Sequence, residues 1–215
     1  MNKEQKYWEN YYKKQNEPFQ ESLFATYCVE QYLKPGMSLL ELGCGNGRDA
    51  VYMSKHGIKV VAIDQCKEEI DFLNGNFRNK NLAFKHDDFS KLKIRQNFDA
   101  IYSRFTLHAV SLQQQNNTLY WGAKHLNPNG YLLIEARGTQ NEYYGLGQPV
   151  ENEPDAFVYE GHYRRFIKPK DTVAQIQGLG LTVISADEQA NRAPFNGTNY
   201  KFLRIIATKQ KTRNY

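Results

Sequence analysis

The chain has 215 residues, with 28 Lys and Arg against 23 Asp and Glu, so its net charge is 28 − 23 = +5. This length suits one domain with a sizeable core. No apolar run approaches the roughly 18 residues that span a bilayer, and the polar N-terminus lacks the apolar core of a signal peptide. The sequence therefore predicts a single cytoplasmic domain over residues 1–215, without a membrane partner.

Much of the positive charge lies in a short basic tail, residues 209–215. Lys209, Lys211 and Arg213 supply three of the five net charges, and the tail contains no acidic residue. The rest of the chain is nearly neutral. Charge therefore favours no nucleic-acid partner, because nucleic-acid-binding proteins concentrate Lys and Arg over a folded surface.

The three cysteines are Cys28, Cys44 and Cys66, an odd number with no C-x-x-C spacing. We therefore expect neither a disulfide framework nor a zinc site built on cysteine. We expect the protein to lie in a reducing compartment. Cys44 has no base beside it in the sequence, so we do not expect it to act as a nucleophile. No histidine–carboxylate cluster has metal-ligand spacing, which predicts a reaction without metal.

Short apolar runs alternate with amphipathic stretches, a pattern typical of a parallel sheet covered by helices. In chain order, the predicted strands are 38–42, 58–63, 82–85, 98–102, 131–136, 181–184 and 202–207. Helices are predicted at 48–56, 67–77, 111–126 and 171–179. Ser111 and Gln114 form a predicted capping box at the start of the third helix. Residues 127–130, Asn-Pro-Asn-Gly, predict a turn before the fifth strand.

Two segments fall outside this alternation. Residues 1–33 precede the first strand and are rich in aromatic side chains. Residues 138–168 connect the fifth strand to the next helix, and a connection of this length in a compact domain is usually a lid, a binding loop or a disordered segment. Its aromatic residues argue against disorder. We expect an N-terminal helical cover at 1–33 and a substrate-side insertion at 138–168.

The strongest local signal is the segment 39–50, LLELGCGNGRDA, at a predicted strand-to-helix turn. Glycines let the backbone approach a ligand closely, and the start of the helix offers free N–H groups. Asp64 ends the next strand, 64 − 43 = 21 residues after Gly43, where a carboxylate can accept both hydroxyls of an adenosine ribose. A dinucleotide loop would need a glycine at position 48, which is Arg48. The spacing therefore disfavours a nicotinamide cofactor.

The segment from Glu41 to Gly47, E-x-G-x-G-x-G, resembles the glycine loop of class I S-adenosylmethionine (SAM) dependent methyltransferases. The resemblance covers most of the chain, including the acidic ends of the second and third strands and the apolar fourth strand. It implies a Rossmann-like α/β fold, with a seven-stranded, mostly parallel sheet flanked by helices, in the strand order 3-2-1-4-5-7-6 with an antiparallel last strand. It also implies SAM as cofactor and S-adenosylhomocysteine (SAH) as product.

The resemblance assigns roles position by position. The three loop glycines would lie against the methionine and ribose parts of SAM, and Asp64 would bind the ribose hydroxyls. Asp88 would bind the adenine amino group and the N–H of Phe89 the ring, with Asp87 replacing Asp88 if the register is shifted by one. Ser103 would lie near the reactive methyl group. The cofactor-binding residues so implied are Glu41, Gly43, Cys44, Gly45, Gly47, Arg48, Asp64, Gln65, Asp88, Phe89, Ser103 and Tyr12.

Arg48 after the loop resembles the small-molecule branch that includes tellurite-resistance and thiopurine methyltransferases. A guanidinium there could bind the methionine carboxylate through two nitrogens. The alternative, that Arg48 is an ordinary surface residue of the helix, is favoured equally. In that branch an N-terminal helix closes over bound cofactor, and Tyr11, Tyr12 and Phe24 are the candidates for this cover. Packing of the same aromatic residues on the sheet is the alternative.

In open parallel sheets the ligand lies beyond the carboxyl ends of the strands, so residues after the fourth and fifth strands should face the transferred methyl group. Arginine side chains suit carboxylates and phosphates, which predicts a small anionic acceptor such as a sugar phosphate, another sugar or a secondary metabolite. Ion pairs of these arginines with Glu135, Glu142, Glu151 or Glu153 are the alternative. The expected substrate-binding residues are Arg104, Arg137, Arg164 and Arg165.

A hydroxyl or ammonium acceptor needs a base, and histidine titrates near neutral pH. His162 and His108 are the candidate catalytic residues. A nucleic-acid methyltransferase is disfavoured because the N/D-P-P-Y/F tetrad after the fourth strand is absent. Protein methylation and a non-catalytic SAM-binding protein remain open alternatives. The expected partner is the small-molecule acceptor. The sequence is compatible with a monomer or a homodimer.

Overall fold

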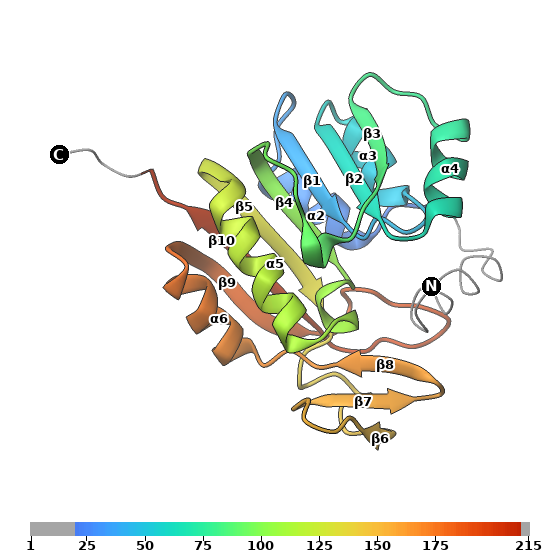
Figure 1. Ribbon diagram of the computed structural model, residues 1–215, viewed down its shortest axis with the longest axis vertical. Coiled ribbons are helices and arrows are strands. Elements are labelled where there is room, and N and C mark those ends of the chain that lie inside the picture. Colours follow the sequence, from blue (N-terminus) through green and yellow to red (C-terminus); the bar gives the residue numbers. More distant parts are fainter. Residues whose placement is uncertain (1–19, 212–215) are drawn as a thin grey trace.

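The computed structural model describes residues 20–211 of the chain. Its main sheet consists of β1 (Ser38–Leu42), β2 (Lys59–Asp64), β3 (Leu82–His86), β4 (Phe98–Arg104), β5 (Leu126–Ala136), β9 (Leu181–Gln189) and β10 (Phe202–Lys209). The strands lie in the order β3-β2-β1-β4-β5-β10-β9 (Figure 1). β10 is antiparallel to both neighbours, and the other pairs are parallel. The predicted Rossmann-like α/β fold and strand order, 3-2-1-4-5-7-6 in seven-strand numbering, are confirmed.

Helices cover both faces of this sheet (Figure 1). One face carries α2 (Leu23–Gln31), α3 (Arg48–Lys55) and α4 (Lys67–Asn76), and the other carries α5 (Leu112–His125) and α6 (Pro169–Gly178). Neighbouring residues of β1 enter opposite cores, with Leu39 on the α3 side and Leu40 on the α5 side. Because both faces are covered, the central strands are rich in apolar residues on both faces. The carboxyl ends of β1, β2 and β4 meet at one edge, where the loops with the predicted site residues begin.

Both ends of α5 are held by side chains. Ser111 Oγ accepts from the backbone N–H of Gln114, and the Gln114 side chain accepts from the N–H of Ser111, so the predicted capping box is confirmed. At the other end, Lys209 Nζ donates to the carbonyl oxygens of Ala123 and Leu126 at 2.9 and 2.8 Å. Lys209 therefore ends β10 and caps a helix, whereas the sequence analysis placed it in a basic tail.

Strand β5 begins earlier than predicted. Leu126 already pairs with β4, and Tyr131 makes the next pair. Residues 127–130, the predicted turn, lie between these two pairs and face the single residue Asp99, whose Oδ1 accepts from Asn127 Nδ2 at 2.8 Å. The turn residues thus form a wide irregularity inside the strand. The strand continues beyond it because the apolar run from Tyr131 restores the parallel register.

The insertion 138–168 contains a small antiparallel sheet of β6 (Gln148–Pro149), β7 (Ala156–Tyr159) and β8 (His162–Arg165). Figure 1 shows it beyond the end of the main sheet at which β5 terminates. Tyr144, Phe157 and Phe166 pack against one another in edge-to-face contacts within the insertion. Local aromatic packing of this kind gives the insertion a structure of its own.

Of the expected N-terminal cover, the structure describes α2 and the residues beside it. Tyr11 and Tyr12 lie outside the described residues, as does Arg213 of the basic tail. Phe24 is buried and stacks on Tyr102 of β4 with ring centroids 5.0 Å apart, so this aromatic residue packs on the sheet. Between residues 20 and 211, no helix has the length and apolar character needed to cross a membrane.

Candidate cofactor and acceptor site

The glycine loop turns sharply between β1 and α3. Gly43, Gly45 and Gly47 have φ values of 70°, 51° and 74°, which L side chains rarely adopt. A Cβ on Gly43 would lie 2.3 Å from Thr106 Cγ2, and one on Gly47 would lie 2.9 Å from Leu73 Cδ2. The chain's own packing therefore requires glycine at both positions, in addition to the predicted approach of the cofactor.

The carboxylate of Asp64 closes the loop against the end of β2. Oδ2 accepts from the N–H of Gly45 and Oδ1 from the N–H of Cys66, each at 2.9 Å. Burial raises the pKa of Asp64, and these two backbone donors oppose the rise. Each carboxylate oxygen can accept a second hydrogen bond, so the predicted bonds to ribose hydroxyls are compatible with this geometry.

Glu41, on β1 just before the loop, is only 3% exposed. Its Oε2 is buried and has no hydrogen-bond partner among the described residues. Burial, followed by the negative charge of Asp49, raises the pKa of Glu41 well above its usual range. A buried oxygen without a partner is costly, so this atom suits a positively charged donor. The ammonium group of the methionine part of SAM is such a donor, and the site therefore fits the cofactor.

The adenine side of the site lies after β3. Asp88 is the N-cap of the short helix η1 (Phe89–Lys91), and its Oδ1 accepts from the N–H and the hydroxyl of Ser90. Asp87 Oδ1 accepts from the N–H of Asp88 at 2.8 Å. Both carboxylates are partly exposed, so the choice between them for the adenine amino group stays a prediction. The carbonyl oxygen of Gln65 accepts a hydrogen bond from Nε2 of His86 at 3.1 Å.

The turn after β4 packs directly on the glycine loop. Ser103 Oγ lies 2.6 Å from Thr106 Oγ1, and Thr106 is the residue that covers Gly43. Between them, Phe105 has a φ of 60°, a strained conformation for an aromatic residue. Its ring contacts His108 at a centroid distance of 5.6 Å. This turn therefore joins the cofactor loop to the residues predicted to bind the acceptor.

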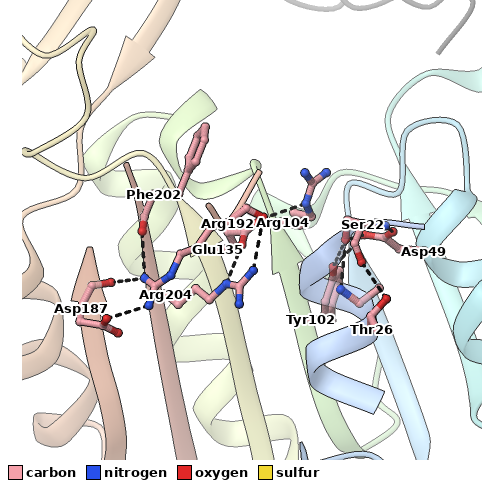
Figure 2. Close-up of polar contacts among 11 residues, drawn as sticks. Ser22, Thr26, Asp49, Tyr102, Arg104, Glu135, Asp187, Arg192, Phe202 and Arg204 are labelled. Atoms are coloured by element: carbon pink, nitrogen blue, oxygen red, sulfur yellow. Dashed lines mark hydrogen bonds and ion pairs between the residues drawn. The ribbon is translucent and has the colours of Figure 1, made fainter. Parts of the chain in front are cut away.

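Arg104 and Arg204 share one buried carboxylate (Figure 2). Nε of Arg104 donates to Glu135 Oε1 at 3.0 Å, and Nε of Arg204 donates to Oε2 at 2.7 Å. Glu135 is 0% exposed, and two cations compensate the burial of its charge. The alternative that an expected acceptor arginine pairs with Glu135 is thus confirmed for Arg104.

A second group of cations gathers around Tyr143, in the insertion. The guanidinium carbons of Arg137 and Arg164 lie 5.0 and 5.3 Å from the centre of its ring. Arg137 Nη1 donates to Asn141 Oδ1, and Arg164 Nη1 donates to the carbonyl of Tyr159. Among residues 20–211, neither arginine forms an ion pair with a carboxylate within 4.0 Å. Burial, and then the charge of Arg164, lowers the pKa of Arg137 to about 10.

Both candidate histidines belong to this group. Burial lowers the pKa of His162 to about 4, and Arg164 and Arg137 contribute. Burial and then Arg137 lower the pKa of His108 well below its usual range. Nδ1 of His108 accepts from the N–H of Arg137 at 3.2 Å, so Nε2 of the neutral ring carries the proton. His108 is therefore suited to donate a hydrogen bond, and the role of His162 as a base stays a prediction.

Arg165 is separated from the other arginines. It alternates with Arg164 along β8, so its side chain leaves the opposite face of the strand. Its Nε donates to the carbonyl of Val110, and its Nη2 donates to the carbonyl of Leu107 and to the Gln115 side chain. Since it is only 4% exposed, Arg165 joins the insertion to the segment after β4, and we leave it out of the acceptor site.

The sequence did not reveal the roles of two side chains, Asp49 beside the glycine loop and Tyr143 in the insertion. Asp49, in the first turn of α3, accepts from the N–H and the hydroxyl of Ser22, both at 2.7 Å (Figure 2). Tyr143 was visible only as one aromatic residue of the insertion, and no local pattern marks it as a platform for two arginines. Among the described residues, no group of three or more His, Cys, Asp or Glu is placed to hold a metal ion; a metal-free reaction stays a prediction.

Residues 8–186 match the family model described as a methyltransferase domain. The chain belongs to this methyltransferase family. The match confirms the predicted family, class I SAM-dependent methyltransferases, and SAM as the cofactor. The chain is 26% identical over 175 residues to a Haemophilus influenzae protein named "Probable S-adenosyl-L-methionine-dependent methyltransferase TehB". That match covers 80% of this chain and 57% of the relative, so the chain spans little more than half of the relative's length.

Solved structures of other proteins share the fold of this chain. A SAM-dependent methyltransferase from Methanosarcina mazei aligns with a TM-score of 0.74 at 18% identity, over 86% of this chain and 97% of that one. The 1,6-didemethyltoxoflavin-N1-methyltransferase of Burkholderia thailandensis, solved with 1,6-didemethyltoxoflavin and SAH, aligns with a TM-score of 0.66 at 17% identity, over 87% of this chain and 77% of that one. At these identities the likeness concerns the fold.

Proposed function

We propose that the protein transfers a methyl group from SAM to a small anionic metabolite, such as a sugar phosphate or an acidic secondary metabolite. The observation that supports this acceptor class is the pair Arg137 and Arg164, which share the ring of Tyr143 without a carboxylate partner among the described residues. Two guanidinium groups held this close repel each other. An anion between them removes the repulsion and gains charge-assisted hydrogen bonds.

The cofactor side has its own set of residues. Asp64 would hold the ribose hydroxyls, Glu41 Oε2 would hold the methionine ammonium, and the glycine loop would surround the part of SAM between these groups. Bound SAM supplies a methyl group that passes from sulfur to a nucleophilic atom of the acceptor, while the electron pair of the broken carbon–sulfur bond remains on sulfur. The chain contributes alignment of the two reactants, which can supply about 7–11 kcal/mol in well-oriented systems.

A protonated acceptor must also lose a proton. His162 is neutral at physiological pH because its pKa is lowered to about 4, so a ring nitrogen can accept that proton. Burial is the main cause of this low pKa, and the charges of Arg164 and Arg137 add to it. An anionic acceptor beside the two arginines opposes only their part of the shift. His108 donates from Nε2 and helps to orient the acceptor.

The test measures SAH formation with carboxylate and phosphate metabolites, each beside its neutral ester or amide. We expect turnover of anionic members only, and we expect Arg137→Gln and Arg164→Gln to raise KM at least about tenfold without changing the Kd for SAH. Arg95→Gln, on an exposed residue, is the control. Turnover restricted to neutral compounds, to a peptide or to RNA would contradict the proposed acceptor.

A further inference from the structure

Arg104 differs from the other predicted acceptor arginines in its surroundings. The arginines that lower the pKa of His108 and His162 include Arg137 and Arg164, and Arg104 is not among them. Arg104 lies on β4 two residues after Tyr102, and Tyr102 pairs with Glu41 of the neighbouring strand β1. Alternation along the strands therefore places Arg104 and Glu41 on the same face of the sheet, and the charge of Arg104 lowers the pKa of Glu41 against the effect of burial. The guanidinium of Arg104 therefore belongs to the neighbourhood of the glycine loop.

The orientation of Arg104 is fixed by its bond to Glu135. The carboxylate of Glu135 holds Nε of Arg104 at 3.0 Å, and Arg204 binds the other carboxylate oxygen at 2.7 Å. Nε of Arg104 is occupied by Glu135. No described residue accepts a hydrogen bond from the two terminal nitrogens of the Arg104 guanidinium group. Figure 2 shows these nitrogens pointing away from Glu135. The Arg104 side chain is only 14% exposed, so little water competes for these nitrogens.

An acidic and a basic side chain on neighbouring strands thus each keep hydrogen-bonding atoms without a described partner. Glu41 offers a buried carboxylate oxygen without a described partner, and Arg104 offers a pair of parallel N–H groups. An α-amino acid carries its ammonium and its carboxylate on one carbon, so a ligand that places the first group on Glu41 brings the second close to a neighbouring cation. Parallel N–H groups of a guanidinium match the two oxygens of a carboxylate.

We infer that Arg104, rather than a residue of the acceptor site, binds the α-carboxylate of the methionine part of SAM, and that Glu135 is the positioning residue that aims it. This role rests on the confirmed cofactor and is independent of the acceptor proposed above. Arg48 is the other cation that acts on Glu41, and the sequence predicts for it either this carboxylate or the role of a surface helix arginine. The buried support from Glu135 favours Arg104.

Calorimetry with two ligands tests this role. SAH contains the amino-acid part, whereas 5′-methylthioadenosine has the same nucleoside and sulfur without it. We expect Arg104→Gln to raise the Kd for SAH at least about tenfold and to leave the Kd for methylthioadenosine within about twofold. Glu135→Gln should shift the SAH affinity in the same direction, again without affecting methylthioadenosine, because it acts only through Arg104.

The control is Arg192→Gln, which breaks an ion pair with Asp187 and should change neither Kd. Should Arg104→Gln fail to fold, Arg104→Lys replaces it; this variant keeps the charge, loses the pair of terminal nitrogens and should still weaken SAH selectively. Equal weakening of both ligands, or unchanged SAH affinity with a raised KM for the acceptor, would overturn the inference. Neither result bears on the anionic acceptor, which depends on Arg137 and Arg164.

Discussion

The hydroxyl of Tyr102, on β4, donates a 2.7 Å hydrogen bond to Oδ2 of Asp49, in the first turn of α3. Both residues are buried. The same carboxylate accepts from Ser22, the N-cap of α2, so one acidic residue connects the strand, the helix after the glycine loop and the N-terminal helix.

Tyr102→Phe removes only the hydroxyl and leaves Asp49 with its two bonds to Ser22. We expect a loss of about 1–2 kcal/mol in the free energy of unfolding, since a hydrogen bond to a charged group is worth about 1.5–3 kcal/mol. Urea unfolding measures the change. Tyr120→Phe, on an exposed tyrosine of α5, is the matched control. Equal stability of the two variants would show that the Tyr102 bond contributes nothing.

Gly43→Ala should lower both stability and SAH affinity. Its Cβ would lie 2.3 Å from Thr106 Cγ2, so the turn after β4 must move. Gly36 has a similarly positive φ of 91° but nothing within 4 Å of the added Cβ. We expect Gly36→Ala to cost about 1 kcal/mol for backbone strain alone, and Gly43→Ala to cost at least twice as much. Thermal unfolding measures the loss of stability, and calorimetry measures the loss of SAH affinity. Equal effects of the two variants would count against the steric explanation.

The lowered pKa of His162 predicts a pH dependence of stability. In the unfolded state His162 binds a proton below its ordinary pKa of about 6.5. In the folded state it binds this proton only near pH 4, so the free energy of unfolding decreases as the pH falls through this range. His162→Gln removes this loss. The variant should gain about 1 kcal/mol relative to the wild type between pH 7.5 and 5, after allowance for solvent screening.

Denaturant unfolding at both pH values measures this difference. His56→Gln is the control, because His56 lies on an exposed helix end. A stability difference between the wild type and His162→Gln that does not change with pH would contradict the prediction.

Lys209→Met should destabilise the protein through α5. The ammonium group donates to the carbonyl oxygens of Ala123 and Leu126, at the end of the helix where the macrodipole is negative. We expect a loss of about 1 kcal/mol, measured by thermal unfolding. Lys93→Met, on an exposed loop residue, should have little effect, and a similar small effect at Lys209 would show that the cap is unimportant.

The fold could be predicted because its signals are local. Each strand of the main sheet is a short apolar run, and the glycine loop and Asp64 lie within one strand–helix–strand unit. The ends of neighbouring parallel strands meet at one edge, so the order of elements already placed the loop near Asp64. The structure adds that the carboxylate of Asp64 reaches the N–H of Gly45.

The remaining features depend on contacts between residues far apart in the chain. Ser22 reaches Asp49 across 27 positions, and Arg104 reaches Glu135 across 31; no local pattern encodes such pairs. Arg165 was grouped with Arg164 because 138–168 was read as a connection. Once β8 is recognised as a strand, alternation sends the two side chains to opposite faces.

Asp64 shows how the site is organised before a ligand arrives. Its carboxylate already accepts from Gly45 and Cys66, so its rotamer is selected when the chain folds. The side-chain entropy of this anchor is lost at that stage and does not oppose binding. In the proposed cofactor site, recognition of the nucleoside therefore begins from a preorganised carboxylate. We expect nucleoside affinity to be sensitive to substitutions that loosen Gly45 or Cys66, even though neither side chain provides the carboxylate.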